Sequence, residues 1–299
     1  MTARVGMAQV GKSMRLKRVI DPAGVSLICA LDHGMTSPTF LEPLADITAR
    51  TAETVAGGAN VIMMSKGMVR LAEPAFSPTT SLALLLSASA NPADAQPEVV
   101  QVAQVEEALR LGADAVVLFT ALGGAAEPRM IRTLADIGRE AASLGVPLIA
   151  EAEFPTTYAQ VEELKEQYGF EYLRRNVRLC AELGADIVKT NWPGDEDLFG
   201  RLVEAAGGIP LVLAGGSRLQ DRELLWRMER ATAAGGIGCS VGRNIFMHRS
   251  PEAITRALSR VIRERWSASK AFEELQEQAG AEGSGEPQGG APVDRREAP

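Results

Sequence analysis

The stretch Leu183-Gly-Ala-Asp-Ile-Val-Lys-Thr190 decides the fold, because the chain repeats its pattern. The same phrase, a helix end with Gly and small residues followed by a short apolar run, occurs at 57–64 and 111–119, with a looser copy at 233–246. Glycine supplies the left-handed residue that ends a helix, and the apolar run is short enough to be a wholly buried strand. We therefore expect Lys189 at the end of a buried strand.

The spacing of the copies predicts the architecture. Successive copies are separated by about twice the length of one strand-loop-helix unit in a barrel of about 250 residues. Further apolar runs occur at 26–32, 82–87, 147–151 and 211–214, and a helical apolar pattern follows the last copy at 252–264. Eight buried strands that alternate with helices predict an α/β fold, a single closed (β/α)8 TIM barrel. An open doubly wound sheet is the alternative.

Length and composition indicate one large globular domain. The 299 residues are 46% hydrophobic and 23% charged, which is enough to bury a substantial core. We expect the barrel and an N-terminal extension to span 1–278, with the basic stretch 11–18 forming a helix packed on the barrel. The segment 279–299 is rich in Gly, Pro and Glu and has too little apolar surface to fold, so we expect a disordered tail.

Charge and cysteine content exclude several classes of function. The net charge of −7 gives no reason to expect nucleic acid or an anionic membrane as a partner. No apolar run approaches the roughly 18 residues of a membrane span, and no signal peptide is recognisable, so we expect a cytoplasmic protein. Cys29, Cys180 and Cys239 lack the paired spacing of a disulfide or a metal site, and we expect them in the core.

Residues suited to catalysis or binding lie where the expected strands end. Barrels of this kind place their active sites at these ends. In chain order, these ends carry Asp32-His33, Lys66, Glu151 with Glu153, Lys189, Gly215-Gly216-Ser217 and Gly242-Arg243. Because the ends of parallel strands meet at one face of a barrel, we expect these side chains to converge there.

Lys189 is the candidate nucleophile of this group. A lysine among apolar residues and near another cation such as Lys66 loses part of its preference for the charged state. Its free amine can then attack a carbonyl carbon to form a Schiff base, which assists cleavage or formation of the neighbouring C–C bond. A structural lysine, ion-paired with Asp32 or Glu151, is the alternative.

The two glycine-rich ends predict a phosphate site. Barrels commonly bind phosphate through backbone N–H groups after the seventh and eighth strands, where this chain has Gly215, Gly216, Ser217 and Gly242. Arg243 would add a charge-assisted contact. Glycines that serve only tight turns are the alternative.

These motifs, in this order, resemble one branch of the class I aldolases. Asp32-His33-Gly34, Lys66-Gly67, the GADIVKT run, Ala214-Gly215-Gly216 and Gly242-Arg243-Asn244-Ile245-Phe246 are similar to the DhnA/LsrF branch. The branch includes archaeal-type fructose-bisphosphate aldolases, aminodideoxyheptulosonate synthases and LsrF thiolases. The resemblance implies a (β/α)8 barrel, Schiff-base chemistry without metal or cofactor, a phosphorylated substrate, and homo-oligomeric rings, often decamers. It also implies that Lys189 forms the Schiff base and that Asp32 contacts substrate hydroxyls.

The fifth expected strand departs from the family pattern. The aldolases of this branch usually carry a tyrosine proton donor just before a proline, whereas this chain reads Glu151-Ala-Glu-Phe-Pro155. Phe154 cannot transfer a proton, so we expect Glu153 or Glu151 to act as the acid/base, because burial can tune a carboxyl toward neutrality.

The resulting interpretation is a class I aldolase that cleaves or forms a C–C bond in a ketose or triose phosphate. Its closest counterparts in the branch would be the fructose-bisphosphate aldolases or a synthase that accepts aspartate semialdehyde. His33 could relay protons or be structural, and Trp192 is expected to line the pocket. Two other functions stay open: a thiolase acting on a phosphorylated diketone, and a sugar-phosphate-binding protein without catalysis.

Overall fold

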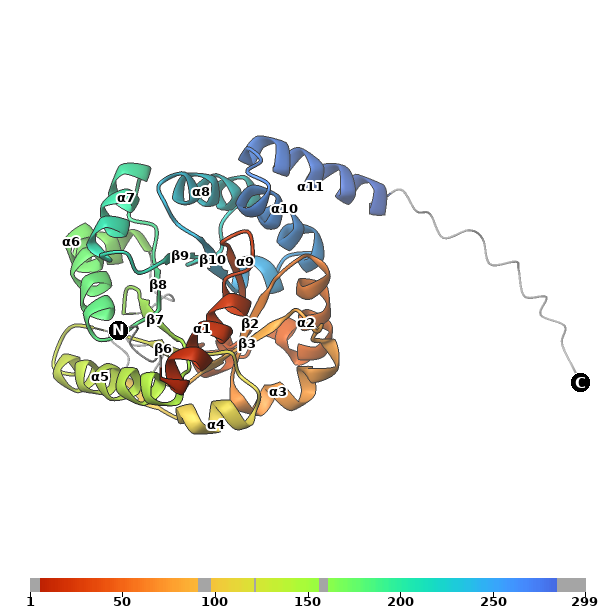
Figure 1. The fold of residues 1–299 in the computed structure, drawn as a ribbon. Coiled ribbons are helices and arrows are strands. Elements are labelled where there is room, and N and C mark those ends of the chain that lie inside the picture. Colours follow the sequence, from red (N-terminus) through yellow and green to blue (C-terminus); the bar gives the residue numbers. More distant parts are fainter. Residues whose placement is uncertain (1–5, 91–97, 121, 156–160, 284–299) are drawn as a thin grey trace, which may run out of the picture.

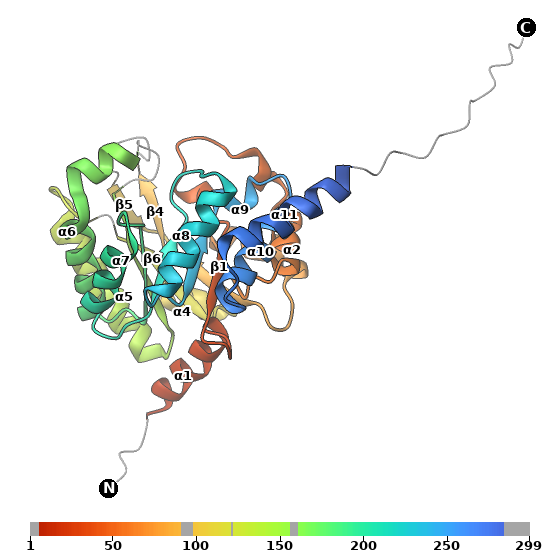
Figure 2. The ribbon, with the colours of Figure 1, turned by 90° about the horizontal axis from the view of Figure 1, so that it is seen from above.

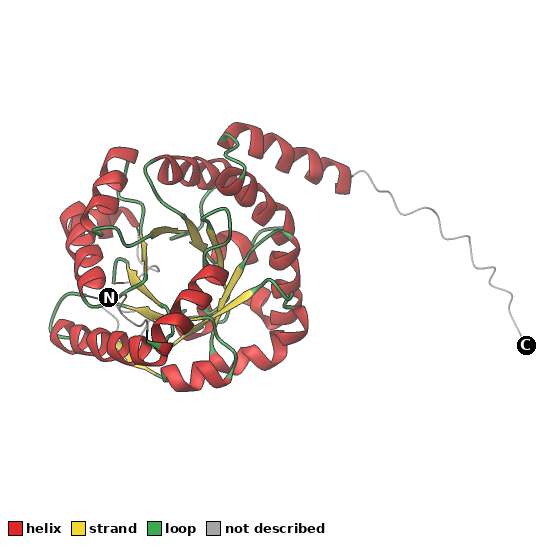
Figure 3. Ribbon diagram, viewed as in Figure 1, coloured by secondary structure: helices red, strands yellow, loops and turns green. Residues whose placement is uncertain are grey.

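The computed structural model describes the backbone of residues 6–90, 98–120, 122–155 and 161–283. Eight parallel strands close into a barrel in the order β1-β10-β9-β8-β7-β6-β3-β2, and helices surround it (Figures 1 and 3). The predicted TIM barrel is confirmed, and the alternative of an open sheet is wrong. The barrel strands are β1 Ser26–Ala30, β2 Val61–Met64, β3 Ser81–Leu85, β6 Ala115–Phe119, β7 Leu148–Ala152, β8 Ile187–Thr190, β9 Leu211–Ala214 and β10 Gly238–Val241.

Each barrel strand lies within or overlaps one of the eight predicted apolar runs. The helices are α1 Met7–Val19, α2 Ile47–Ala56, α3 Lys66–Ala72, α4 Val105–Arg110, α5 Glu127–Leu144, α6 Val161–Glu182, α7 Glu196–Ala205, α8 Asp221–Ala233, α9 Arg243–Phe246, α10 Pro251–Arg263 and α11 Ala268–Gly283. Short 3-10 turns occur at His33–Met35, Glu42–Ala45 and Glu73–Ala75. Helix α6 is interrupted at Gly169, whose φ is 65°.

Two apolar layers hold the barrel together. One fills its interior with alternate strand residues such as Ile28, Val117, Ile149 and Ile187. The other lies between the strands and the surrounding helices. Because side chains alternate across a strand, residues two positions beyond Ile149 and Ile187 also face inward. This alternation directs Glu151 and Lys189 into the barrel.

The chain outside the barrel follows the predictions in part. Helix α1 lies at the end of the barrel opposite the hairpin of β4 Ser87–Ala90 and β5 Glu98–Gln101 (Figure 2). Lys12 on α1 forms an ion pair with Asp186 at 2.9 Å. Helix α11 continues to Gly283, and the rest of the segment expected to be a tail, 284–299, lies outside the described residues. The three cysteines are free and buried, as expected.

One element was not predicted. Strands β4 Ser87–Ala90 and β5 Glu98–Gln101 pair antiparallel directly after β3. Strand β4 of this hairpin contacts the turn at His33–Met35, which follows β1. The hairpin therefore lies at the carboxyl-terminal end of the barrel strands. None of the described helices is long and apolar enough to cross a membrane.

Candidate active site

Lys189 lies between two buried carboxylates at the inner face of the barrel. Strands β7 and β8 pair so that Glu151 is opposite Lys189, and both point inward. Lys189 Nζ donates a hydrogen bond to Glu151 Oε1 at 2.7 Å. It also lies 2.8 Å from Glu153 Oε1, but this second contact lacks hydrogen-bond geometry, and Glu153 Oε1 accepts no hydrogen bond from the described residues. All three residues are buried, with no more than 8% of their surface exposed.

The surroundings raise the pKa of Lys189. Burial alone would lower it, but the negative charges of Glu151, Glu153 and Asp32 outweigh that effect. The expectation of a lysine whose charge is weakened by a neighbouring cation is therefore wrong. Lys66 is exposed, and its Nζ lies 3.0 Å from Glu107 Oε1. In the absence of substrate, Lys189 is an ammonium ion.

The pKa of Glu151 is raised to about 7, and burial is the largest cause. Lys189 lowers it, whereas the nearby charges of Glu153 and Asp32 raise it further. A carboxyl with such a pKa can take up or release a proton near neutral pH, as a general acid or base must. The hydrogen bond between Lys189 and Glu151 places this carboxyl where it could exchange a proton with the lysine.

Polar contacts fix the strand that carries the two glutamates. Thr120 Oγ1 donates to the Glu151 carbonyl at 2.7 Å, and Thr190 Oγ1 donates to the Ala152 carbonyl at 2.9 Å. Beyond β7, the Phe154 N–H donates to Asn191 Oδ1 at 2.7 Å. These bonds hold the backbone on both sides of Glu153 in place.

Phe154 occupies the position next to Glu153 and is buried in an aromatic group. Its ring stacks on Tyr172 of α6 with centroids 6.1 Å apart. The Tyr172 hydroxyl donates to the Leu122 carbonyl, and burial raises the pKa of this phenol. Tyr172 is thus a structural neighbour of Glu153 that the sequence did not reveal.

Asp32 and His33 complete the charged group from the end of β1. Asp32 is buried, which opposes ionisation, but His33 and Lys189 together hold its pKa below the usual value. His33 Nδ1 lies 3.4 Å from Asp32 Oδ1, and the ring packs edge-on against Phe246 at 5.0 Å. The ring also sets a limit at Gly242, where a Cβ atom would overlap His33 Cε1.

The two glycine-rich ends form one hydrogen-bonded unit. Asn244 Nδ2 donates to the carbonyls of Gly215 and Ser217 at 3.1 and 3.0 Å, and Asn244 Oδ1 accepts from the Leu219 N–H. Arg243 Nη2 donates to the Gly216 carbonyl at 2.9 Å. Gly216 has φ 64°, a conformation that favours glycine. The Gly-Arg-Asn motif already contained Asn244, but its connecting role could not be read from spacing.

Two of the predicted site residues point elsewhere. The exposed Lys66 pairs with Glu107 of α4 rather than with the Lys189 group. Trp192 is buried, but it stacks on Phe199 of α7 at 6.0 Å and meets Trp226 of α8 at 5.8 Å. It belongs to the layer between strands and helices rather than to the barrel interior.

No group of three His, Cys, Asp or Glu side chains suited to a metal ion occurs in the described ranges. What the residues do provide is an inward lysine at the end of a barrel strand and carboxylates within hydrogen-bond reach of it. These are the parts that a class I aldolase requires.

Comparison with known proteins identifies the family to which this chain belongs. A model of the DeoC/LacD family of aldolases matches residues 26–248. The chain is 35% identical over 256 residues to the 2-amino-3,7-dideoxy-D-threo-hept-6-ulosonate synthase of Halobacterium salinarum, covering 86% of this chain and 93% of the relative. A second such synthase, from Archaeoglobus fulgidus, is 31% identical over 253 residues, covering 85% and 91%.

Solved structures of aldolases are also similar to this chain. An archaeal fructose 1,6-bisphosphate aldolase superposes with a TM-score of 0.74 at 26% identity, covering 85% of this chain and 99% of the other. A further structure of an archaeal fructose-1,6-bisphosphate aldolase has its catalytic lysine bound to the carbinolamine intermediate of the substrate. It superposes with a TM-score of 0.73 at 26% identity, covering 84% of this chain and 99% of the other. The chain is a class I aldolase. It belongs to the DeoC/LacD family of aldolases, which confirms the resemblance seen in the sequence.

The packing of His33 against Gly242 generates a prediction about stability. Gly242→Ala should destabilise the protein by about 1–3 kcal/mol, because its Cβ would overlap His33 Cε1 and would lie 2.8 Å from the Ala30 carbonyl oxygen. Thermal unfolding measures this cost. Gly34→Ala is the matched control, since a Cβ there meets nothing within 4 Å and the backbone is not left-handed. Equal losses in the two variants would contradict the close approach.

Proposed function

We propose that this aldolase forms its Schiff base on Lys189, with the carbonyl carbon of a phosphorylated ketose or triose. The observation that carries the proposal is the contact of Lys189 Nζ with Glu151 and Glu153 at 2.7 and 2.8 Å inside the barrel. The archaeal fructose 1,6-bisphosphate aldolase structure supports a phosphorylated sugar as substrate, and the two archaeal synthases, named for an ulosonate, support a sugar-derived substrate or product.

Formation of the imine begins with a proton transfer from Lys189 to Glu151. The hydrogen bond between them allows the ammonium to become an amine when a carbonyl group enters and disturbs the ion pair. The amine nitrogen then bonds to the carbonyl carbon, the oxygen takes a proton to give a carbinolamine, and water leaves to give the iminium. Glu151, now protonated, is placed to supply the proton that the departing hydroxyl requires.

Cleavage of the C–C bond requires a second proton acceptor, and Glu153 suits that task. The base removes the proton of the hydroxyl on the carbon beyond the breaking bond. The bonding electrons move into the iminium to give an enamine, and the other fragment leaves as an aldehyde. Protonation and hydrolysis of the enamine then release the ketone and restore Lys189. The reverse sequence performs a condensation. Glu153 is the better candidate, because its Oε1 accepts no hydrogen bond from the part of the chain that the structure describes.

Asp32 and the glycine-rich unit would bind the rest of the substrate. Asp32 is ionised, faces the Lys189 group and can accept hydrogen bonds from sugar hydroxyls. We propose that Gly215, Gly216, Ser217, Gly242 and Arg243 hold the phosphate. Arg243 brings a cation to this loop, and the hydrogen bonds of Asn244 keep both loop segments in one arrangement.

Three further expectations stay predictions: a cytoplasmic location, a homo-oligomeric ring, and substrate contacts by His33, Lys66 and Trp192. Sedimentation of the purified protein would determine the size of the assembly.

The first functional prediction concerns the covalent intermediate. Incubation with dihydroxyacetone phosphate or fructose 1,6-bisphosphate and borohydride should reduce the imine to a stable adduct, which mass spectrometry locates on the peptide with Lys189. Lys189→Ala should abolish the adduct and the aldol reaction together. An adduct on Lys66 would refute the assignment. Phosphate binding without any adduct would favour the non-catalytic binding protein, and acyl transfer to a thiol would favour the thiolase.

The second prediction separates the two glutamates. Glu153→Gln should leave borohydride trapping at Lys189 intact but slow turnover roughly 10²–10⁴-fold, the usual contribution of a positioned acid or base. Glu151→Gln should slow trapping itself, because Lys189 loses its proton acceptor. Near-normal turnover in both variants would exclude acid/base roles for the pair.

The pH dependence gives an independent measurement of Glu151. With a pKa of about 7, this carboxyl is protonated at lower pH and cannot take the proton of Lys189. In the wild-type enzyme, kcat/KM should therefore fall as the pH drops below about 7, and this limb should disappear in Glu151→Gln. A limb that persists unchanged in the variant must belong to another group.

The fourth functional prediction concerns the phosphate site. Arg243→Ala should weaken binding of a phosphorylated ligand by about 1.5–3 kcal/mol, the range for a hydrogen bond to a charged group. Binding of the unphosphorylated analogue should hardly change. Calorimetric titration of both ligands is the measurement, and equal losses would indicate a damaged barrel rather than a lost phosphate contact.

A further inference from the structure

A cavity of about 670 Å³ lies at the amino-terminal end of the strands, opposite the end that carries Lys189. Its walls are residues of 17–22, which lead from α1 into β1, of 55–60 before β2, and of 77–81 before β3, together with Asp114 and Arg263. We call it the basal cavity. Its volume is typical of sites for small molecules, and no step of the aldolase chemistry uses it.

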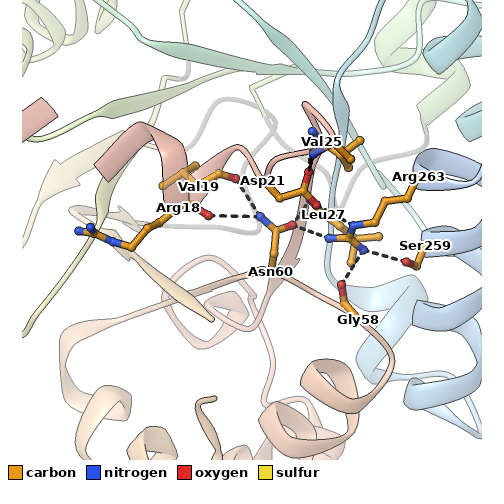
Figure 4. A network of polar contacts seen from close by, with 10 residues as sticks. Arg18, Val19, Asp21, Val25, Leu27, Gly58, Asn60, Ser259 and Arg263 are labelled. Carbon is orange, nitrogen blue, oxygen red and sulfur yellow. Dashed lines mark hydrogen bonds and ion pairs between the residues drawn. The ribbon is translucent and has the colours of Figure 1, made fainter. Parts of the chain in front are cut away.

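A hydrogen-bond network makes one wall of the basal cavity rigid (Figure 4). Asn60 Oδ1 accepts from the Leu27 N–H at 2.8 Å and from Arg263 at 2.9 Å, and Asn60 Nδ2 donates to the Val19 carbonyl at 2.9 Å. Arg263 also donates to Asp21 at 2.8 Å. The network ties α1, β1, β2 and α10 together, so the cavity is preformed and a ligand need not order its wall.

The charges of the lining leave one cation without a partner. Arg18 pairs with Asp114 at 2.6 Å, and Arg263 pairs with Asp21 at 2.8 Å. Lys17 is exposed and forms no ion pair with any described residue. Three cations against two carboxylates give the lining a formal charge of +1, carried by Lys17.

Hydroxyl groups line the wall contributed by the loop before β3. Ser77 Oγ lies 3.1 Å from Thr79 Oγ1 and 2.7 Å from Thr80 Oγ1. Two hydrogens satisfy these two contacts, so one of the three O–H groups stays available to a ligand oxygen. At the inner edge, Ser81 is 1% exposed, and its Oγ has no hydrogen-bond partner among the described residues. A buried hydroxyl without a partner is uncommon and indicates a site that another group completes.

We propose that the basal cavity binds a small hydroxylated anion, with its phosphate or carboxylate group on Lys17 and its hydroxyls on the loop 77–81. The unpaired cation selects negative charge, and the hydroxyl-rich wall selects a polar rather than an apolar body. The two ion pairs of the lining already satisfy each other, so they set the shape of the cavity. This proposal is independent of the role of Lys189.

Calorimetric titration with inorganic phosphate and with citrate, as separate probes, tests the proposal on the full-length protein. Lys17→Ala should weaken binding about tenfold, and added salt should shrink the difference, because the contact is exposed to solvent. Thr79→Val keeps the shape and removes one exposed hydroxyl, and it should weaken binding severalfold. Arg132→Ala, which removes another exposed cation on α5, is the matched control and should change nothing.

Measurements in the Arg243→Ala background separate the basal cavity from the proposed phosphate loop at the other end. Binding that persists in Arg243→Ala and is lost in Lys17→Ala supports the basal cavity. Tighter binding of phosphate would identify a phosphate ester as the ligand class, and tighter binding of citrate a hydroxy acid. Equal affinities of wild type and Lys17→Ala, loss of all binding in Arg243→Ala, or no binding of either probe at roughly 10 mM would overturn the proposal.

Discussion

The burial of Lys189 among three carboxylates is the constraint on which the rest of the site depends. Removing ions from water costs several kcal/mol each, and only close, well-oriented partners offset that cost. The barrel meets the requirement through the register of β7 and β8, which sets Glu151 opposite Lys189. Burial is the main reason that the pKa of Glu151 is raised, and the negative charges of Glu153 and Asp32 raise it further. The register of β7 and β8 thus provides Lys189 with a partner for its charge and also with a carboxyl group that can accept its proton.

Most of the fold could be predicted from the sequence, because a parallel barrel strand is buried on both faces and appears as a short apolar run after a helix end. The repeats at 57–64, 111–119 and 183–190 each gave one strand. The β4–β5 hairpin escaped prediction for a physical reason. The Ser-Ala-Ser-Ala strand at 87–90 has no large apolar side chain, so its sequence gives no strong strand signal, and its antiparallel pairing with 98–101 could not be seen from it.

The site was predictable to the level of strand ends but not of side-chain directions. Parallel strands bring their ends to one face, and this rule placed Asp32, Glu151 and Lys189 together. It could not show that Trp192 turns outward to Phe199, because the strand has ended there and alternation no longer applies. The direction of the pKa shift of Lys189 could not be predicted either, because it depends on which charged neighbours come close to the lysine.

The hydrogen bonds of Asn244 have a consequence for how this enzyme can be altered. They join the loops after β9 and β10 into one body, so a change in either loop displaces both. New substrate preferences are therefore easier to reach through segments that are not coupled in this way, such as the stretch around Phe154 or the β4–β5 hairpin. In directed evolution, the Asn244 unit is better kept unchanged, with diversity confined to segments that its hydrogen bonds do not join.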